Sequence, residues 1–89
     1  MKRIKIIISG QVHGVGFRSF LKKNAPILNL KGYAKNLLNN KVEAIFEGKE
    51  EDIKKILDLC KKGPENSVVK KIEFKKEKYK AEFNDFLVY

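Results

Sequence analysis

The chain has 89 residues, which accommodate one hydrophobic core, so we expect a single domain over residues 1–89. Hydrophobic residues make up 43% of the chain and lie in periodic segments, so it is not expected to be disordered. The net charge of +9 predicts attraction to anions, whether nucleic acid, acidic membrane or phosphorylated small molecule, although the scattered lysines fit a solvated surface at least as well as a nucleic-acid track. A single cysteine, Cys60, excludes an internal disulfide and a cysteine-type zinc site, and no segment has the length of a signal-peptide core or a membrane span, so we expect a cytoplasmic protein.

The first third of the chain predicts a strand, a glycine-rich loop and a helix. Ile4 to Ser9 is a short β-branched run that ends at a glycine, as in a buried strand. The segment GQVHGVG follows, and from Phe17 onward apolar residues recur at three- and four-residue intervals, which predicts a helix. Pro26 interrupts that pattern, because an interior proline removes a backbone hydrogen bond and clashes with the preceding turn. The helix is therefore expected either to kink there or to end early and restart.

Two further strands, residues 32–36 and 41–47, are predicted around an Asn39-Asn40 turn. Asparagine tolerates positive φ, so this pair is a credible hairpin turn, although less favourable than Asn-Gly. Apolar and acidic residues alternate along the second of these strands, which predicts one buried and one exposed face: Val42, Glu43, Ala44, Phe46 and Glu47.

The clearest helix in the sequence covers residues 50–62. Its apolar residues form one stripe, acidic residues stand at its positive end and lysines at its negative end, and Gly63-Pro64 predicts its end. Strands are predicted at residues 68–75 and 83–89. Cys60 and the strand phenylalanines are expected in the core: Phe46, Phe74, Phe83 and Phe86.

The order strand, helix, strand, strand, helix, strand, with one extra C-terminal strand, predicts an α+β fold. Two βαβ halves of this kind form a ferredoxin-like α/β sandwich, an antiparallel sheet with both helices on one face. Many unrelated functions use that fold, so it does not identify an activity.

The segment from Gly10 to Arg18, GQVHGVGFR, carries the chemistry. A glycine-rich loop that leads from a strand into a helix can turn several backbone N–H groups toward one anion, at the positive end of the helix dipole. Arg18, in the first helical turn, can reach the same anion with a guanidinium fork that matches phosphate oxygens. Spacing alone fits a tight loop without a ligand equally well. The segment is neither a Walker A loop nor a dinucleotide-binding fingerprint, because Gly-Lys-Ser/Thr and the third glycine are missing.

The same segment resembles the acylphosphatase signature, a Gly-x-Val-Gln-Gly-Val-x-Phe-Arg loop. GYAKN at residues 32–36, followed by KVEAIFEG at residues 41–48, resembles the second signature of that family. GPENSVVKKIE at residues 63–73 and the closing FLVY are also similar to family segments, so the resemblance spans nearly the whole chain.

The resemblance implies a hydrolase that splits acyl phosphates into carboxylate and phosphate without a metal or cofactor. It places the phosphate-binding arginine at Arg18 and the water-orienting asparagine at Asn36. The phosphate cradle would be the backbone of the loop and first helical residues, which also predicts that phosphate or sulfate binds there: Val12, His13, Gly14, Val15, Gly16, Phe17 and Arg18. No membrane or specific nucleic-acid partner is expected, and we expect a monomer.

Three positions depart from the family pattern. His13 replaces the usual glutamine, either as a loop-surface side chain or as an imidazolium that adds pH dependence near bound phosphate. Asn40 replaces a turn glycine, a substitution that tolerates the left-handed region. Pro26 lies about two turns beyond Arg18, so the cradle is expected to be unaffected.

Two other functions are compatible with parts of the sequence. Ferredoxin-like sheets also bind RNA in RRM domains, and KGYA at residues 31–34 matches the start of the RNP1 pattern; Lys35 and Leu38 then stand where stacking aromatics are needed. Acylphosphatase-like domains also form the N-terminal part of a hydrogenase-maturation carbamoyltransferase, but this sequence is expected to be free-standing, and a phosphate-binding member without turnover stays possible.

Overall fold

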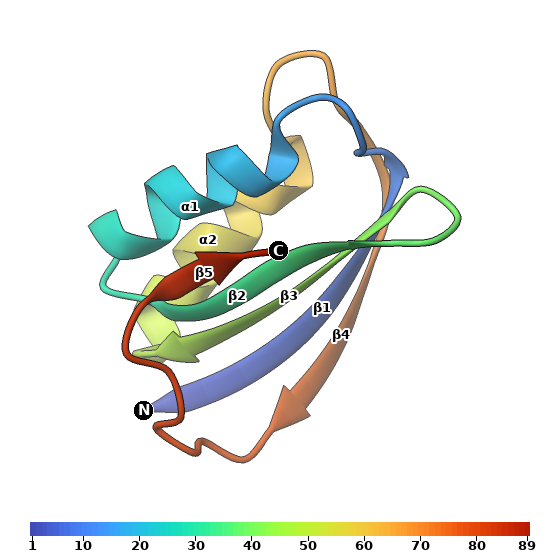
Figure 1. Ribbon diagram of the computed structural model, residues 1–89. Coiled ribbons are helices and arrows are strands. Elements are labelled where there is room, and N and C mark those ends of the chain that lie inside the picture. Colours follow the sequence, from blue (N-terminus) through green and yellow to red (C-terminus); the bar gives the residue numbers. More distant parts are fainter.

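The computed structural model describes all residues, 1–89, in two layers: one five-stranded sheet and two helices that cover the same face of it (Figure 1). The elements follow in this order: β1 (Lys2–Gln11), α1 (Phe17–Ile27), β2 (Lys31–Leu37), β3 (Lys41–Gly48), α2 (Glu50–Lys62), β4 (Val68–Glu77) and β5 (Phe86–Val88). The spatial strand order is β4-β1-β3-β2-β5. The first four strands pair antiparallel, as in the predicted ferredoxin-like sandwich, and β5 pairs parallel to β2, which makes the sheet mixed.

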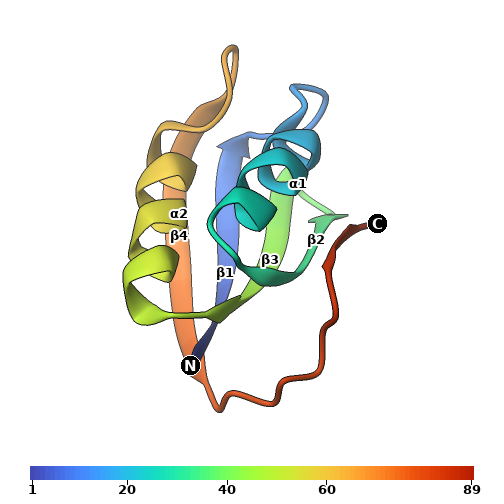
Figure 2. The same ribbon diagram turned by 90° about the vertical axis from the view of Figure 1, so that its left-hand side faces the viewer.

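The core lies between the helices and the sheet, because every second residue of the central strands points toward the helices. Figure 2 shows α1 and α2 side by side on that face, with α2 over β4. The helical contributions come from one stripe on each helix, and all members of the core are buried: Ile4, Ile6, Ile8, Val12, Phe17, Leu21, Ala25, Leu30, Ala34, Val42, Ala44, Phe46, Ile53, Ile56, Cys60 and Phe86.

Helix α2 begins and ends where the sequence predicts, with three acidic residues in its first turn, two lysines in its last turn and Gly63 as its C-cap. Helix α1 continues through Pro26 and ends one residue later, at Ile27, without a second helical segment. The proline therefore marks the end of the helix. The residues after it turn back toward the sheet, and the N–H of Leu30 donates to the carbonyl of Ala25 at 2.9 Å.

The predicted hairpin is confirmed: Asn39 and Asn40 both have positive φ, 62° and 56°. The predicted exposure of the strand after it is wrong, because β3 is buried on both faces. Glu43 and Glu47 are only 7% and 3% exposed. They lie on the face away from the helices. Side chains of neighbouring strands contact Glu43, and the segment of residues 78–84 contacts Glu47.

That segment connects β4 to β5 and crosses below the sheet (Figures 1 and 2). The carboxylate of Glu47 accepts hydrogen bonds from the backbone N–H groups of Lys80 and Glu82, and it also pairs with the buried Arg3 at 3.2 Å. The ring of Phe83 lies against Tyr33, with the ring centroids 5.9 Å apart. The predicted strand over residues 83–89 is therefore too long, because its first part is this connection and only Phe86–Val88 is strand.

One predicted core residue is wrong. Phe74 is 52% exposed on β4, the outer edge strand, although α2 packs against other residues of that strand. Phe83 is half-buried, while Phe46 and Phe86 stack in the core with ring centroids 5.5 Å apart.

Candidate active site

The loop between β1 and α1 has only five residues, and its glycines give it its shape. Gly14 and Gly16 have φ values of 68° and 75°, in the left-handed region that other residues adopt only at a cost. A Cβ added at either position would meet no protein atom within 4 Å. Backbone conformation and open space, rather than tight packing, therefore explain both glycines, and the space beside them is available to a ligand.

The loop ends at an uncompensated helix N-terminus. Gly16 is the N-cap of α1 and provides no side-chain hydrogen bond, and the first turn of α1 has no acidic residue. The first turn of α2, in contrast, contains Glu50, Glu51 and Asp52. Because the first N–H groups of a helix have no partner within it, those of α1 stand at a positive dipole end that no carboxylate of its own neutralises. An anion is the natural ligand of such an end.

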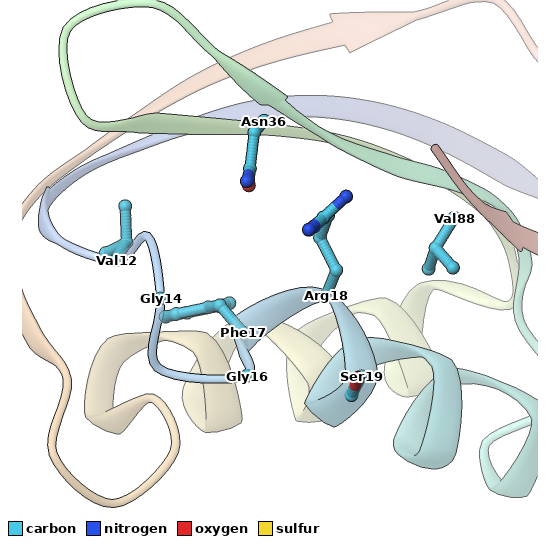
Figure 3. Close-up of a pocket in the computed structure, with 8 residues that line it drawn as sticks. All are labelled: Val12, Gly14, Gly16, Phe17, Arg18, Ser19, Asn36 and Val88. Atoms are coloured by element: carbon cyan, nitrogen blue, oxygen red, sulfur yellow. The ribbon is translucent and has the colours of Figure 1, made fainter.

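A cavity of about 270 Å³ opens in front of this helix end. The loop forms one side of it, and β2 and β5 form the other, as Figure 3 shows. Its lining residues come from four elements or loops: Val12, Gly14, Gly16, Phe17, Arg18, Ser19, Asn36 and Val88. The structure thus brings Arg18 and Asn36, which are 18 positions apart in sequence, to one cavity.

Arg18 extends from the first turn of α1 into the cavity (Figure 3). Its Nη1 donates a hydrogen bond to the backbone oxygen of Tyr89 at 2.5 Å, and this is the only hydrogen bond of the side chain within the protein. Tyr89 is itself held to the sheet, because its N–H donates to the carbonyl of Ala34 on β2 at 3.0 Å. The C-terminal residues therefore orient the guanidinium and leave its other N–H groups for a ligand.

Asn36 extends into the cavity from β2, on the same face of the strand as the buried Ala34. Its backbone pairs with Val42 on β3. The side-chain amide makes no hydrogen bond within the protein and is exposed, so both its donor and its acceptor are free to hold a water molecule or a ligand oxygen.

Two residues of the predicted cradle do not line the cavity. His13 is absent from the lining, and its Nε2 lies 2.7 Å from the carbonyl oxygen of Lys41. Val15 is half-buried and packs against the core. Of the predicted set, Val12, Gly14, Gly16, Phe17 and Arg18 line the cavity.

The groups with displaced pKa values lie outside the cavity. Burial raises the pKa of the Cys60 thiol to about 12, which leaves it protonated and unreactive at neutral pH. Burial and the hydrogen bond to Glu43 raise the pKa of Tyr33 to about 12, on the other face of the sheet. No group of three or more His, Cys, Asp or Glu side chains is placed to hold a metal ion. None of the helices is long and apolar enough to span a membrane.

Comparison with known proteins identifies the family. The family model described as Acylphosphatase matches residues 4–88. The chain belongs to the acylphosphatase family. An acylphosphatase from Syntrophus aciditrophicus is 36% identical over 88 residues, which cover 99% of this chain and 92% of the relative. The crystal structure of acylphosphatase from Bacillus subtilis superimposes with a TM-score of 0.95 at 30% identity, covering 100% of this chain and 99% of that one.

Acylphosphatase-like sequence also occurs within a much longer protein. A probable carbamoyltransferase HypF from Methanocaldococcus jannaschii is 42% identical over 87 residues, which cover 97% of this chain but 11% of that protein. The family assignment rests on the family model and on the relatives of matching length.

Sequence reasoning missed the contribution of β5 to the site. Val88 lines the cavity, and Tyr89 orients Arg18 through a main-chain oxygen. Such a contact leaves no signal in side-chain identity, because any residue at that position carries the same oxygen. The resemblance of the closing FLVY was the only indication that this end of the chain matters.

Proposed function

We propose that this protein is an acylphosphatase that hydrolyses acyl phosphates to a carboxylate and inorganic phosphate without a metal ion. The observation that carries the proposal is the common cavity of Arg18, Asn36 and the loop at the N-terminus of α1. The substrate anion and the reacting water can meet there, and the cavity otherwise offers only small or apolar side chains and Ser19.

In the proposed reaction the phosphoryl dianion docks against the loop and the first turn of α1. The N–H groups of residues 12–17 and the free N–H groups of Arg18 donate to its oxygens, at the positive end of the helix dipole. Phosphoryl transfer disperses negative charge over these oxygens, so donors fixed before the reaction stabilise the transition state more than they stabilise free substrate.

Asn36 holds the attacking water on the side of the phosphorus opposite the acyl oxygen. The water oxygen forms the new P–O bond while the bond from phosphorus to the acyl oxygen breaks and the carboxylate leaves with the electron pair. One proton of the water passes to a phosphoryl oxygen of the substrate, which removes the need for a strong general base in the protein. A carboxylate is a good leaving group, so positioning and charge stabilisation suffice for much of the rate.

We propose that the protein acts in the cytoplasm as one domain and as a monomer, with no specific nucleic-acid partner. The face of the sheet away from the helices supports the last point. Its central position holds Glu43, which already pairs with Lys5 at 3.2 Å and with Lys35 at 3.5 Å. The hydroxyl of Tyr33 also donates to Glu43, and its ring packs against Phe83 and Tyr89, so Tyr33 already has partners within the protein and is not free to stack on a base.

The test is phosphate release from a simple acyl phosphate in the presence of EDTA. We expect wild-type protein to be active with the chelator, and Arg18→Ala and Asn36→Ala each to lose on the order of 100-fold or more in turnover. Ser19→Ala is the matched control, because Ser19 lines the same cavity but its side chain points away from Arg18 and Asn36 in Figure 3. Unchanged turnover in Arg18→Ala, or activity that EDTA abolishes, would contradict the proposal.

A further inference from the structure

His13 is the only polar side chain among the five residues of the loop, and it makes the only side-chain hydrogen bond from the loop to the rest of the protein. Its Nε2 lies 2.7 Å from the carbonyl oxygen of Lys41. A carbonyl oxygen only accepts, so the ring nitrogen must carry the hydrogen and donate. The neutral ring with its proton on Nε2 and the imidazolium both provide that donor, and the hydrogen bond therefore persists whether or not the ring is charged.

The acceptor of this hydrogen bond belongs to the strand pair that carries Asn36. Lys41 is the first residue of β3 and pairs with Leu37, the last residue of β2. Asn36 directly precedes Leu37 and pairs with Val42. The imidazole of His13 is thus connected to Asn36 through two adjacent backbone pairs of a regular antiparallel ladder, which is a short and stiff path.

The remaining contacts of the loop do not fix its orientation relative to the β2–β3 hairpin. Val12 and Phe17 are 1% and 2% exposed and anchor the two ends of the loop in the core. Gly14 and Gly16 have no side chains, and Val15 makes only apolar contacts with the core. Apolar contacts are not directional, so the hydrogen bond of His13 is the directional tie between the loop and the β2–β3 hairpin.

We infer that His13 is a positioning residue for the hydrolysis, which holds the phosphate-binding loop in register with Asn36 through its hydrogen bond to the carbonyl of Lys41. The inference rests on the proposed function, because it assigns phosphate to the loop and water to Asn36. The imidazole of His13 touches neither of them. It sets the distance and angle between the two, on which in-line attack depends strongly.

Two substitutions at this position separate the hydrogen bond from the volume of the side chain. His13→Leu fills similar space without a donor, and His13→Gln keeps an N–H donor. We expect His13→Leu to lower kcat roughly tenfold, since a small displacement of reacting groups has effects of this size or larger. The inhibition constant of inorganic phosphate should stay close to the wild-type value, because the loop amides and Arg18 are intact. His13→Gln should recover most of the lost kcat.

A double-mutant cycle with Asn36→Ala tests the coupling directly. If His13 acts by placing the loop against Asn36, His13→Leu should cost almost nothing further in the Asn36→Ala background. Losses that multiply in the double variant, or a phosphate inhibition constant that rises in proportion to the loss of kcat, would overturn the inference. Wild-type protein without acylphosphatase activity would overturn the proposed function and this inference with it, whereas an active wild type with multiplying losses would overturn the inference alone.

The hydrogen bond itself can be observed in wild-type protein, without any variant or activity. In a ¹⁵N-resolved NMR spectrum of the neutral His13 ring, Nε2 should carry the proton and Nδ1 should not. A ring that is protonated at Nδ1, or that averages between the two tautomers, would contradict the contact on which the inference depends.

Discussion

Glu47 provides the sharpest test of how the structure holds its C-terminal connection. Its carboxylate is 3% exposed and accepts three hydrogen bonds, from Nη1 of Arg3 at 3.2 Å and from the N–H groups of Lys80 at 3.0 Å and Glu82 at 3.2 Å. Hydrogen bonds to a charged acceptor contribute roughly 1.5 kcal/mol or more each. Arg3 keeps Glu77 and Glu82 as partners, and water can reach part of the connection. We therefore expect Glu47→Ala to lower the free energy of unfolding by about 3 kcal/mol.

A loss of this size is a large fraction of the roughly 5–15 kcal/mol that stabilises a typical domain. It corresponds to a fall in Tm of roughly 15 °C for a chain of this length. Urea unfolding followed by far-UV circular dichroism measures it. Glu73→Ala is the control, because Glu73 lies on the same face of the sheet, on β4, but is exposed and unpaired; its effect should stay within about 0.5 kcal/mol. Equal effects of Glu47→Ala and Glu73→Ala would refute the reasoning.

Three further predictions concern the loop, pH and the cysteine. Gly16→Ala should lower stability by about 1–2 kcal/mol in urea unfolding, because alanine is strained at φ 75° while its Cβ meets no atom; Gly16→Asn should cost less, and the reverse order would contradict the conformational explanation. Burial raises the pKa of Glu43, but hydrogen bonds from Tyr33 and Lys5 outweigh burial and hold the pKa below its usual value. The stability that Glu43 contributes is therefore present at neutral pH and lost as the pH falls through the lowered pKa, so the difference in unfolding free energy between wild type and Glu43→Gln should shrink as the solution is acidified; a constant difference would argue against it. Cys60 is fully buried and burial raises its pKa to about 12, so a thiol reagent should modify it only in denaturant, and rapid modification of native protein would show that the core opens there.

The elements that the sequence predicts well are those in which several local signals agree. In α2 the apolar stripe, the charges at both ends and Gly63 all indicate the same first and last residues, and the helix begins and ends there. The Asn39-Asn40 turn follows from the positive φ that asparagine tolerates. Helix α1 has only one such signal at its end, Pro26, and a proline is compatible with a kink or an end until its surroundings are known.

The wrong predictions concern what covers a strand, which alternation alone does not reveal. Glu43 and Glu47 look like residues of an exposed face, yet both are buried. Side chains of β1 and β2 contact Glu43, and Arg3 and the segment of residues 78–84 contact Glu47. Phe74 looks like a core residue, yet it is 52% exposed on the edge strand β4. Burial at these positions depends on segments distant in sequence.

At the site, the residues with chemically specific side chains were predictable from the sequence. The hydrogen bonds to backbone oxygens that position these side chains were not. Arg18, Asn36 and the two loop glycines follow from the motifs, and the structure brings them to one cavity. The orientation of Arg18 by the main chain of Tyr89 and the direction of His13 toward Lys41 both involve backbone oxygens. Backbone acceptors are the same for every residue type, so only the fold reveals them.

The central claim is that the loop and the first turn of α1 bind a phosphate dianion with Arg18. A titration of ¹⁵N-labelled protein with inorganic phosphate, followed by amide chemical shifts, tests it most directly. The largest, saturable changes should fall on the amides of residues 12–17, and Arg18→Ala should abolish saturation. Changes that spread over the lysines of the sheet while these amides stay unchanged would contradict it.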